Sequence, residues 1–320
     1  MTPSTAVAGK MSRVAGMPIS TTRSVFFRRM FGGLLCLVFI LYLAGCSMVR
    51  LGYSQLPDLA YWWMDSYLDL DEAQSVALRN DLTQLHDWHR SQELAPLAQT
   101  LAQLQAQALQ DTTPAAVCQV VDDLRPSLQA LADQSTPALT RLAVSLKPEQ
   151  LAHLQRQLTK RQQSWRDDWL SDDPAERLAK RSKRLIERSE MFYGRLSDTQ
   201  RAQLRGRVAA SGFDPVLMQT ELLRRHQDLL QTAQLLAQGA LGEAQAQAQT
   251  RQLLARLMRS PDAAYRQRMH LINQENCQTF AALHNSTTPA QKQKLADSLK
   301  GYELDARALV PTQTAARSAR

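Results

Sequence analysis

From residue 57 onward, apolar residues recur at intervals of three and four, and no long stretch alternates apolar with polar residues. The first spacing is typical of amphipathic helices, whereas half-buried strands require alternation. Gln, Ala, Leu and Arg, which favour helices, are abundant in the same region, and prolines separate the periodic segments. The sequence therefore predicts an all-α fold, an elongated bundle of antiparallel helices over residues 57–310, followed by a disordered tail at 311–320.

The periodic segments set the bounds of the predicted helices. These cover residues 57–68, 71–94, 96–110, 114–146, 148–170, 174–193, 198–211, 214–238, 243–259, 262–284 and 289–308. The segment 114–146 holds one helix or two, because Pro126 and Pro137 interrupt it. The segment 148–170 carries an apolar seam that another helix, or a second copy of the chain in a homodimer, would cover. The seam consists of Leu151, Leu154, Leu158, Trp165 and Trp169.

The N-terminal 45 residues differ from the rest of the chain, because they contain five basic residues and no acidic one. Arg28 and Arg29 directly precede an apolar run, Met30–Gly45, that ends in small residues. At 16 residues the run is shorter than the roughly 20 that a membrane-spanning helix needs. Basic, apolar and small residues in this order are typical of a secretory signal peptide, so we expect residues 1–45 to be cleaved.

The sequence "LAGC" at residues 43–46 resembles the lipobox of bacterial lipoproteins. That resemblance implies cleavage before Cys46, a diacylglycerol on its thiol and an acyl chain such as palmitate on the new amine. Ser47 stands where Asp usually signals retention in the inner membrane. We therefore expect a protein held on the periplasmic face of the outer membrane, with residues 46–56 as a lipidated tether. The alternative is an uncleaved signal anchor in which the cysteine is incidental.

After removal of the signal peptide and lipidation of Cys46, Cys118 and Cys277 remain. In an oxidising periplasm they could form one disulfide, and the alternative is two buried thiols. Without the five leader residues, 33 basic residues face 30 acidic ones, a net charge of about +3. This balance removes the main support for a nucleic-acid-binding protein, so we expect no nucleic acid among the partners.

Four predicted helix starts share a pattern in which Gln follows a candidate N-cap by three residues and Leu follows that Gln by four. The glutamines are Gln74, Gln150, Gln200 and Gln291. Asp71, Ser197 and Thr288 are good N-caps, and the glutamine can complete a capping box, whereas Lys147 is a poor cap. The residues by themselves therefore indicate only where helices begin.

The same pattern, clearest in "LSDTQ" at 196–200, resembles the LTxxQ signature of the periplasmic Spy/CpxP family. That resemblance implies a helical stress chaperone that binds unfolded clients on a cradle. A longer stretch, "CSMVRLGYSQLPDLAYWWMDSYLDLDEAQ" at 46–74, resembles a family of uncharacterised proteobacterial lipoproteins with a domain of unknown function. This second resemblance implies the lipid anchor and the helical topology, and it brings no activity.

The sequence contains no convincing catalytic grouping, phosphate loop or cysteine cluster, so we expect neither an enzyme nor a cofactor. Only His86 and His89 are close in sequence, and a zinc site there would need Asp81 or Asp87. We interpret the pair as a polar edge beside Trp88 and predict no metal site.

Two surfaces are candidates for binding. The first is a basic helix face that would meet an acidic client or an anionic surface, with Trp165 and Trp169 contacting apolar segments; it consists of Arg177, Lys180, Arg181, Arg184 and Arg188. The second is an aromatic patch that would lie at the lipid headgroups; it consists of Tyr53, Tyr61, Trp62, Trp63 and Tyr67. The alternatives are a solvated helix face and a buried stripe of Leu59, Trp63 and Tyr67.

These observations predict an outer-membrane lipoprotein whose periplasmic helical body binds another macromolecule without catalysis, in the manner of a chaperone. The alternative is a structural spacer of the envelope or an assembly partner of a specific complex. The two differ in that a chaperone binds many unfolded chains, whereas an assembly partner binds one stable protein.

Overall fold

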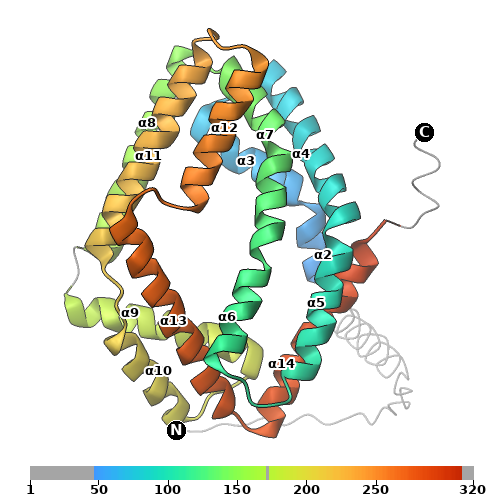
Figure 1. Cartoon of the computed structure of the whole chain (residues 1–320), viewed down its shortest axis with the longest axis vertical. Coiled ribbons are helices and arrows are strands. Elements are labelled where there is room, and N and C mark those ends of the chain that lie inside the picture. Colours follow the sequence, from blue (N-terminus) through green and yellow to red (C-terminus); the bar gives the residue numbers. More distant parts are fainter. Residues whose placement is uncertain (1–46, 171–172, 312–320) are drawn as a thin grey trace, which may run out of the picture. The chain divides into compact units, whose positions relative to one another are not determined.

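The computed structural model describes residues 47–170 and 173–311. The chain divides into two units, Met1–Met48 and Val49–Arg320. Almost all of the first unit, with the predicted signal peptide and Cys46, lies outside the described residues, as does the predicted tail from residue 312. Every regular element in the described residues is a helix, so the predicted all-α class is confirmed (Figure 1). None of the described helices is both long and apolar enough to cross a membrane.

The helices are α2 (Ser47–Ser54), α3 (Leu56–Leu68), α4 (Glu72–Gln92), α5 (Leu94–Gln107), α6 (Pro114–Asp123), α7 (Arg125–Ser145), α8 (Pro148–Trp169), α9 (Pro174–Tyr193), α10 (Asp198–Ala210), α11 (Pro215–Ala237), α12 (Glu243–Met258), α13 (Ala263–Asn285) and α14 (Pro289–Leu309). Most agree with the predicted ranges to within about two residues. The helix α2 occupies residues that we predicted to form a tether.

The segment 114–146 forms two helices, which meet at Leu124 and Arg125. Pro126 lies in the first turn of α7, where its missing N–H removes no helical hydrogen bond. The predicted interruption at Pro137 is wrong, because α7 continues through this residue. Thr136 and Thr140 beside it are buried, and Thr140 donates a hydrogen bond to Thr250 of α12 at 2.8 Å. Packing against α12 therefore holds α7 together across its proline.

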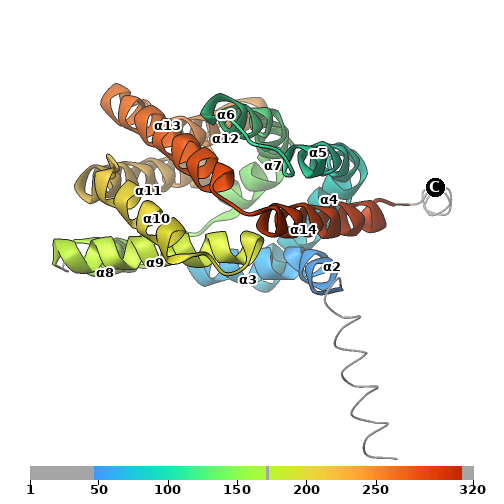
Figure 2. The ribbon, with the colours of Figure 1, turned by 90° about the horizontal axis from the view of Figure 1, so that it is seen from below.

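Within the unit Val49–Arg320 the helices form two halves, α3–α8 and α9–α14, with corresponding contacts. In the first half α3 packs on α4 and α8, and α4 packs on α7. In the second half α9 packs in the same way on α10 and α14, and α10 packs on α13. The middle helices of each half contact the other half. In the first half α5 packs on α14 and α6 on α13, and in the second α11 packs on α8 and α12 on α7 (Figures 1 and 2). Within the all-α class, the helices thus form two halves that exchange their middle helices.

The recurring glutamines join helix starts in pairs. Gln74 and Gln150 lie at the third positions of α4 and α8 and are both buried. Each accepts the backbone N–H of its own N-cap, Asp71 or Lys147, at 3.1 and 2.9 Å. Each side-chain amide also donates across the pair to a backbone carbonyl, Gln74 to Ser145 at 2.8 Å and Gln150 to Asp69 at 2.9 Å. The glutamine is therefore both a capping residue and a link between two helices.

The second half repeats this arrangement with Gln200 of α10 and Gln291 of α14. Gln200 donates to the carbonyl of Ser286 at 3.0 Å, and Gln291 donates to that of Arg195 at 3.1 Å. The predicted caps Asp71, Ser197 and Thr288 all accept from the glutamine backbone. Lys147 has no acceptor on its side chain and instead forms an ion pair with Asp71 at 3.0 Å.

Each half has an apolar core beside its glutamine pair. The first contains Tyr61, Leu68, Leu78, Leu142, Leu146, Leu154, Leu158 and Ala233, and the second contains Ala108, Tyr193, Leu196, Leu204, Leu283, Leu295 and Ala296. Leu154 and Leu158 of the predicted seam are buried in the first core. The seam is thus filled within the chain, by α3 and α11.

The structure joins Cys118 of α6 and Cys277 of α13 in a disulfide, with their Cα atoms 5.6 Å apart. The two cysteines are 159 residues apart in sequence and belong to different halves. In the chain-entropy treatment a disulfide that closes so long a loop contributes about 2–5 kcal/mol to stability. It fixes the contact of α6 with α13, one of the contacts between a middle helix and the opposite half.

Candidate binding surface on α9 and α10

The basic helix α9 begins at Asp173, whose carboxylate accepts the backbone N–H of Ala175 at 3.3 Å. Pro174 occupies the first helical position. The helix ends at Gly194, where a positive φ of 74° favours glycine. One face, with Ser182, Ser189 and Tyr193, is buried, and this fixes which basic side chains point outward.

The structure divides the predicted basic face. Arg181 is partly buried, donates to the hydroxyl of Ser211 and stacks over the ring of Phe213 at 4.4 Å. Burial lowers the pKa of its guanidinium, and the nearby carboxylate of Glu275 partly offsets this lowering. Arg184 and Arg188 are exposed. Arg181 therefore packs within the protein, whereas Arg184 and Arg188 belong to the outer surface.

The two predicted tryptophans meet this helix through an aromatic cluster. The rings of Trp165 and Trp169 lie 5.5 Å apart, and the ring of Trp169 lies 5.4 Å from Phe213. The guanidinium of Arg184 lies 5.1 Å from the centre of the Trp169 ring. The structure thus brings Trp169 and Arg184 together, as one surface would require. It also places Arg177 and Lys180 on α9, where Arg177 is partly buried and Lys180 is exposed.

An apolar groove that the sequence did not predict separates α9 from α10. Its volume is about 530 Å³, and its lining consists of Ala175, Leu178, Ala179, Ser182, Lys183, Ile186, Glu187, Arg201 and Arg205. Apolar side chains form its floor. Three basic residues and a single acidic one stand among the lining residues, and Arg201 is held by Glu190 at 2.6 Å. The arrangement fits an apolar segment that carries acidic residues.

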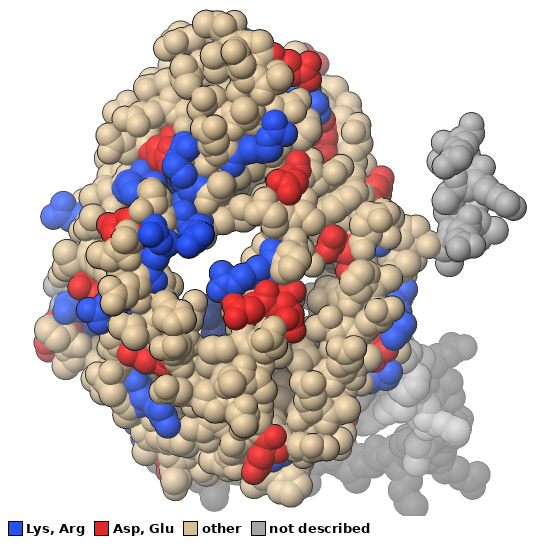
Figure 3. Space-filling model, viewed as in Figure 1, with Lys and Arg blue, Asp and Glu red and all other residues tan. Residues whose placement is uncertain are grey.

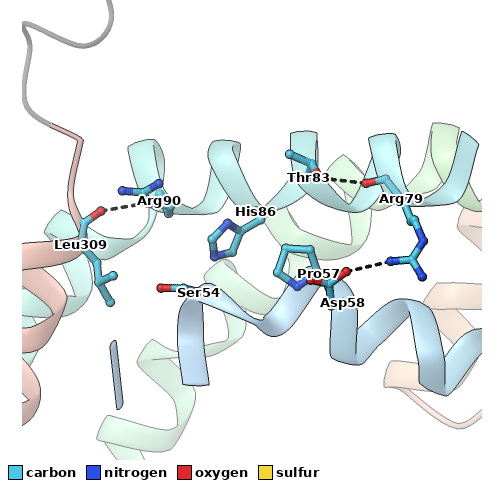
Figure 4. A pocket seen from close by; sticks show the side chains of 8 residues that line it. All are labelled: Ser54, Pro57, Asp58, Arg79, Thr83, His86, Arg90 and Leu309. Carbon is cyan, nitrogen blue, oxygen red and sulfur yellow. Dashed lines mark hydrogen bonds and ion pairs between the residues drawn. The ribbon is translucent and has the colours of Figure 1, made fainter. Parts of the chain in front are cut away.

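The corresponding place in the first half is a polar pocket of about 360 Å³ beside α3 and α4 (Figure 4). Within it Arg79 pairs with Asp58 at 2.8 Å, and Arg90 donates to the carbonyl of Leu309 at 3.0 Å. His86 lies 3.1 Å from the carbonyl of Tyr53. The two halves therefore differ beside their first two helices, where one has a polar pocket and the other an apolar groove.

The predicted polar edge at His86 and His89 is built around Tyr53. The Tyr53 hydroxyl lies 2.8 Å from Nδ1 of His89, and burial lowers the pKa of both histidines. Among the described residues, His, Cys, Asp and Glu form no group of three or more that could hold a metal ion.

A further charged cluster lies where α11 and α12 approach the start of α13. Figure 3 shows basic side chains gathered there beside a hollow in this face. Glu221 is buried and accepts from Arg224 at 2.8 Å, Arg225 at 2.7 Å and Ser260 at 2.9 Å. Asp228 pairs with Arg256 at 2.7 Å. These bonds link α11 to α12 and to the loop that precedes α13, so the cluster is a structural network as well as a basic surface.

The second predicted surface is partly buried and partly exposed. Tyr61 is buried, whereas Trp62 and Trp63 are 60% and 64% exposed. Leu59 is also exposed, so the alternative of a buried Leu59–Trp63–Tyr67 stripe is wrong for its first two members. The buried stripe of α3 contains Tyr61 and Leu68 instead.

A family model described as a family of unknown function, DUF6279, matches residues 66–267, which is more than half of the chain. No curated protein and no solved structure matches. The matched range ends inside α13, so Gln291 and the rest of α14, which pack against the matched region, lie beyond it.

Proposed function

The chain belongs to the DUF6279 family, and for it we propose a non-catalytic binding role at a membrane surface. The protein is held on the periplasmic face of the outer membrane by lipid on Cys46. Its groove between α9 and α10 takes apolar, acidic segments of incompletely folded proteins. It thereby acts as a membrane-tethered, chaperone-like protein.

The observation that carries this proposal is the groove itself. Its floor is apolar, and Lys183, Arg201 and Arg205 stand at its edge. An unfolded segment would bury its apolar side chains on the floor, and its carboxylates would approach the basic rim. Exposed charges attract over a Debye length of about 10 Å at 0.1 M salt, so the rim favours encounter with acidic segments.

The aromatic cluster where α8 meets α9 provides a second surface, outside the lining of the groove. Trp169 and Arg184 lie side by side at the exposed edge of α8 and α9. Tryptophan and arginine are the residues that most often dominate binding energies at interfaces. The predicted residues Trp169, Arg184 and Arg188 therefore serve in this proposal, while Arg181 supports them from below.

The location rests on the sequence "LAGC", and the disulfide supports it. Structural disulfides persist in oxidising compartments such as the periplasm. Cys118 and Cys277 are joined, and Cys277 is only 4% exposed. A buried cross-link between the two halves is the kind of bond that an exported protein retains.

The proposal assigns no chemical step to the chain. Two groups with clearly shifted pKa values form internal contacts. Burial raises the pKa of Tyr193, whose hydroxyl lies 2.9 Å from Nδ1 of the buried His284. Burial opposes ionisation of Glu221, but bonds from Arg224, Arg225 and Ser260 outweigh it and lower its pKa to about 2. Such groups stabilise packing and do not require a substrate.

The test is suppression of aggregation by the chain reconstituted in lipid nanodiscs. A denatured model protein is diluted into buffer at low and high salt, and light scattering is followed. We expect the parent chain to reduce scattering, and more strongly at low salt. Ala179→Trp places an indole in the groove and should abolish the effect, whereas Ala255→Trp, at an exposed site on α12, should retain it.

Equal suppression by the two variants would contradict the groove as the binding site. No suppression by the parent chain at either salt concentration would contradict the chaperone-like role. In that case a search for one stable envelope partner, by cross-linking in intact membranes, would test the assembly role instead.

A further inference from the structure

The helix α3 is apolar on two opposite faces, which is unusual for a helix at a protein surface. Its inner face packs Tyr61 and Leu68 into the first core. Its outer face carries Leu56, Leu59 and Trp63, spaced three and four residues apart and 47–64% exposed. Trp62 beside them is 60% exposed. The outer face therefore has no covering element within the described residues.

The preceding helix α2 carries two further exposed apolar residues, Val49 and Leu51, which are 43% and 57% exposed. Each charged residue on α2 and α3 has a partner within the chain. Arg50 pairs with Asp305 at 3.0 Å, Asp58 pairs with Arg79 at 2.8 Å, and Asp65 accepts the backbone N–H of Leu70 at 2.9 Å. The charged groups of these two helices are thus bonded within the protein, whereas the apolar residues on the outer face of α3 are exposed.

The size of this surface exceeds that of scattered exposed residues. The two indoles alone expose about 250 Å², taking about 200 Å² for each side chain. Exposed apolar patches beyond a few hundred Å² mark interaction sites in soluble proteins. Leu56 and Leu59 on the same face of α3 add to this area.

We propose that the outer face of α2 and α3 lies in the interfacial layer of the bilayer, as a second membrane attachment beside the lipid on Cys46. This rests on the membrane tether of the proposed function, but not on the groove. The chain connects Cys46 to Leu51 by five residues, a span of at most about 18 Å. Whichever way the N-terminal segment is attached, this face begins next to the membrane.

The composition of the face fits that occupant. Tryptophan is enriched at membrane interfaces, where the indole ring meets apolar chains and its N–H meets headgroups. Helices that lie in the interface bury an apolar face to a depth of about 5–10 Å. A lipid anchor alone leaves the protein free to rotate about its tether, whereas an embedded α3 fixes which face of the body meets the membrane.

The test uses the full chain reconstituted in vesicles that contain phospholipid brominated near the headgroup end of the acyl chains. Bromine quenches tryptophan emission only at close range. We expect quenching in the parent chain, loss of most of that quenching in Trp62→Phe/Trp63→Phe, and retention in the matched variant Trp88→Phe. Both sites of the double variant are exposed, so the fold is preserved, which circular dichroism checks.

Quenching that is equal in the parent and the Trp62→Phe/Trp63→Phe variant overturns the proposal. Absence of quenching in a chain that floats with the vesicles also overturns it. Cross-linking of two copies of the chain through this face does so as well. The mass of the N-terminal peptide reports the lipid on Cys46 separately. Quenching of Trp62 and Trp63 in a chain without that lipid would support the embedded face and contradict the lipid anchor.

Discussion

Gln74 and Gln150 exchange side-chain hydrogen bonds: Nε2 of Gln74 donates to Oε1 of Gln150 at 3.0 Å, and Nε2 of Gln150 donates to Oε1 of Gln74 at 2.7 Å. Gln200 and Gln291 do the same at 3.0 and 3.2 Å. A motif that resembles the signature of a chaperone family thus forms hydrogen bonds inside this protein. Its glutamines are directed at each other and at backbone groups, and their role is structural.

Gln74→Ala should lower the free energy of unfolding by about 2–4 kcal/mol, because it leaves several buried polar groups without a partner. The matched control is Gln245→Ala at the start of α12. Gln245 also bonds its N-cap backbone, at 3.4 Å, but is exposed, so a loss below about 0.5 kcal/mol is expected. Urea unfolding followed by circular dichroism measures both. Equal losses would contradict a special role for the pair.

Reduction of the Cys118–Cys277 disulfide should lower the free energy of unfolding by about 2–5 kcal/mol. The expected result is a lower urea midpoint when a phosphine reductant is present. The control is Cys118→Ser/Cys277→Ser, whose midpoint should match that of the reduced parent and should not respond to the reductant. A parent midpoint that ignores complete reduction, verified by thiol labelling, would refute the expectation.

Stability should fall in acid partly through Glu221. Its pKa is about 2 in the folded chain, against an ordinary value of 4.5, so its stabilising contribution is present above about pH 4.5 and disappears as the pH falls toward 2. Glu221→Gln should flatten the decline between these values by about 1–3 kcal/mol. Urea unfolding at stepped pH measures this.

The matched control for that experiment is Glu243→Gln, an exposed carboxyl in the first turn of α12. The free energy of unfolding of this variant should fall with pH as it does in the parent. Glu303, whose pKa is also lowered to about 2 by bonds from Gln105, Lys300 and Arg307, should leave part of the decline in both variants. An unchanged slope in Glu221→Gln would show that its network does not stabilise the fold.

The arginines of α9 should separate into two classes. Arg181→Ala removes a partly buried group that contacts Phe213 and Ser211, so it should lower stability by about 1–3 kcal/mol. Arg184→Ala should change stability by less than about 0.5 kcal/mol but weaken binding of an acidic unfolded segment. Thermal unfolding and fluorescence anisotropy with a labelled peptide measure the two effects. A stability loss from Arg184→Ala as large as that from Arg181→Ala would refute the division.

Local signals predicted most of the helices, because the information lies within a few residues of each start. Asp71, Ser197 and Thr288 mark their helices by cap chemistry alone. Pro137 misled the prediction, since a proline ends a helix only where the surrounding packing does not hold the turn together. The pairing of the caps could not be predicted, because residues 76 and 91 positions apart meet only through the tertiary fold.

The candidate surfaces were predicted unevenly for the same reason. A helical wheel places Arg181 and Arg184 on one broad face, but Phe213 from a distant loop covers only the first of them. The groove beside α9 needs α10 at a particular angle, which periodicity does not give. Leu59 and Trp63 are exposed because the opposite stripe of α3, with Tyr61, occupies the core. The sequence is compatible with burial of either of these two stripes.

The exchange of middle helices has a consequence for biogenesis. The helix α5 lacks its main partner until α14 is present, and the first core lacks Ala233 until α11 packs on α8. Contacts between such distant segments slow folding, because long loops must close before burial repays their entropy. During synthesis α5 would therefore stay uncovered until α14 has been made. The unfinished chain would thus expose apolar surface of the kind that the finished protein is proposed to bind in others.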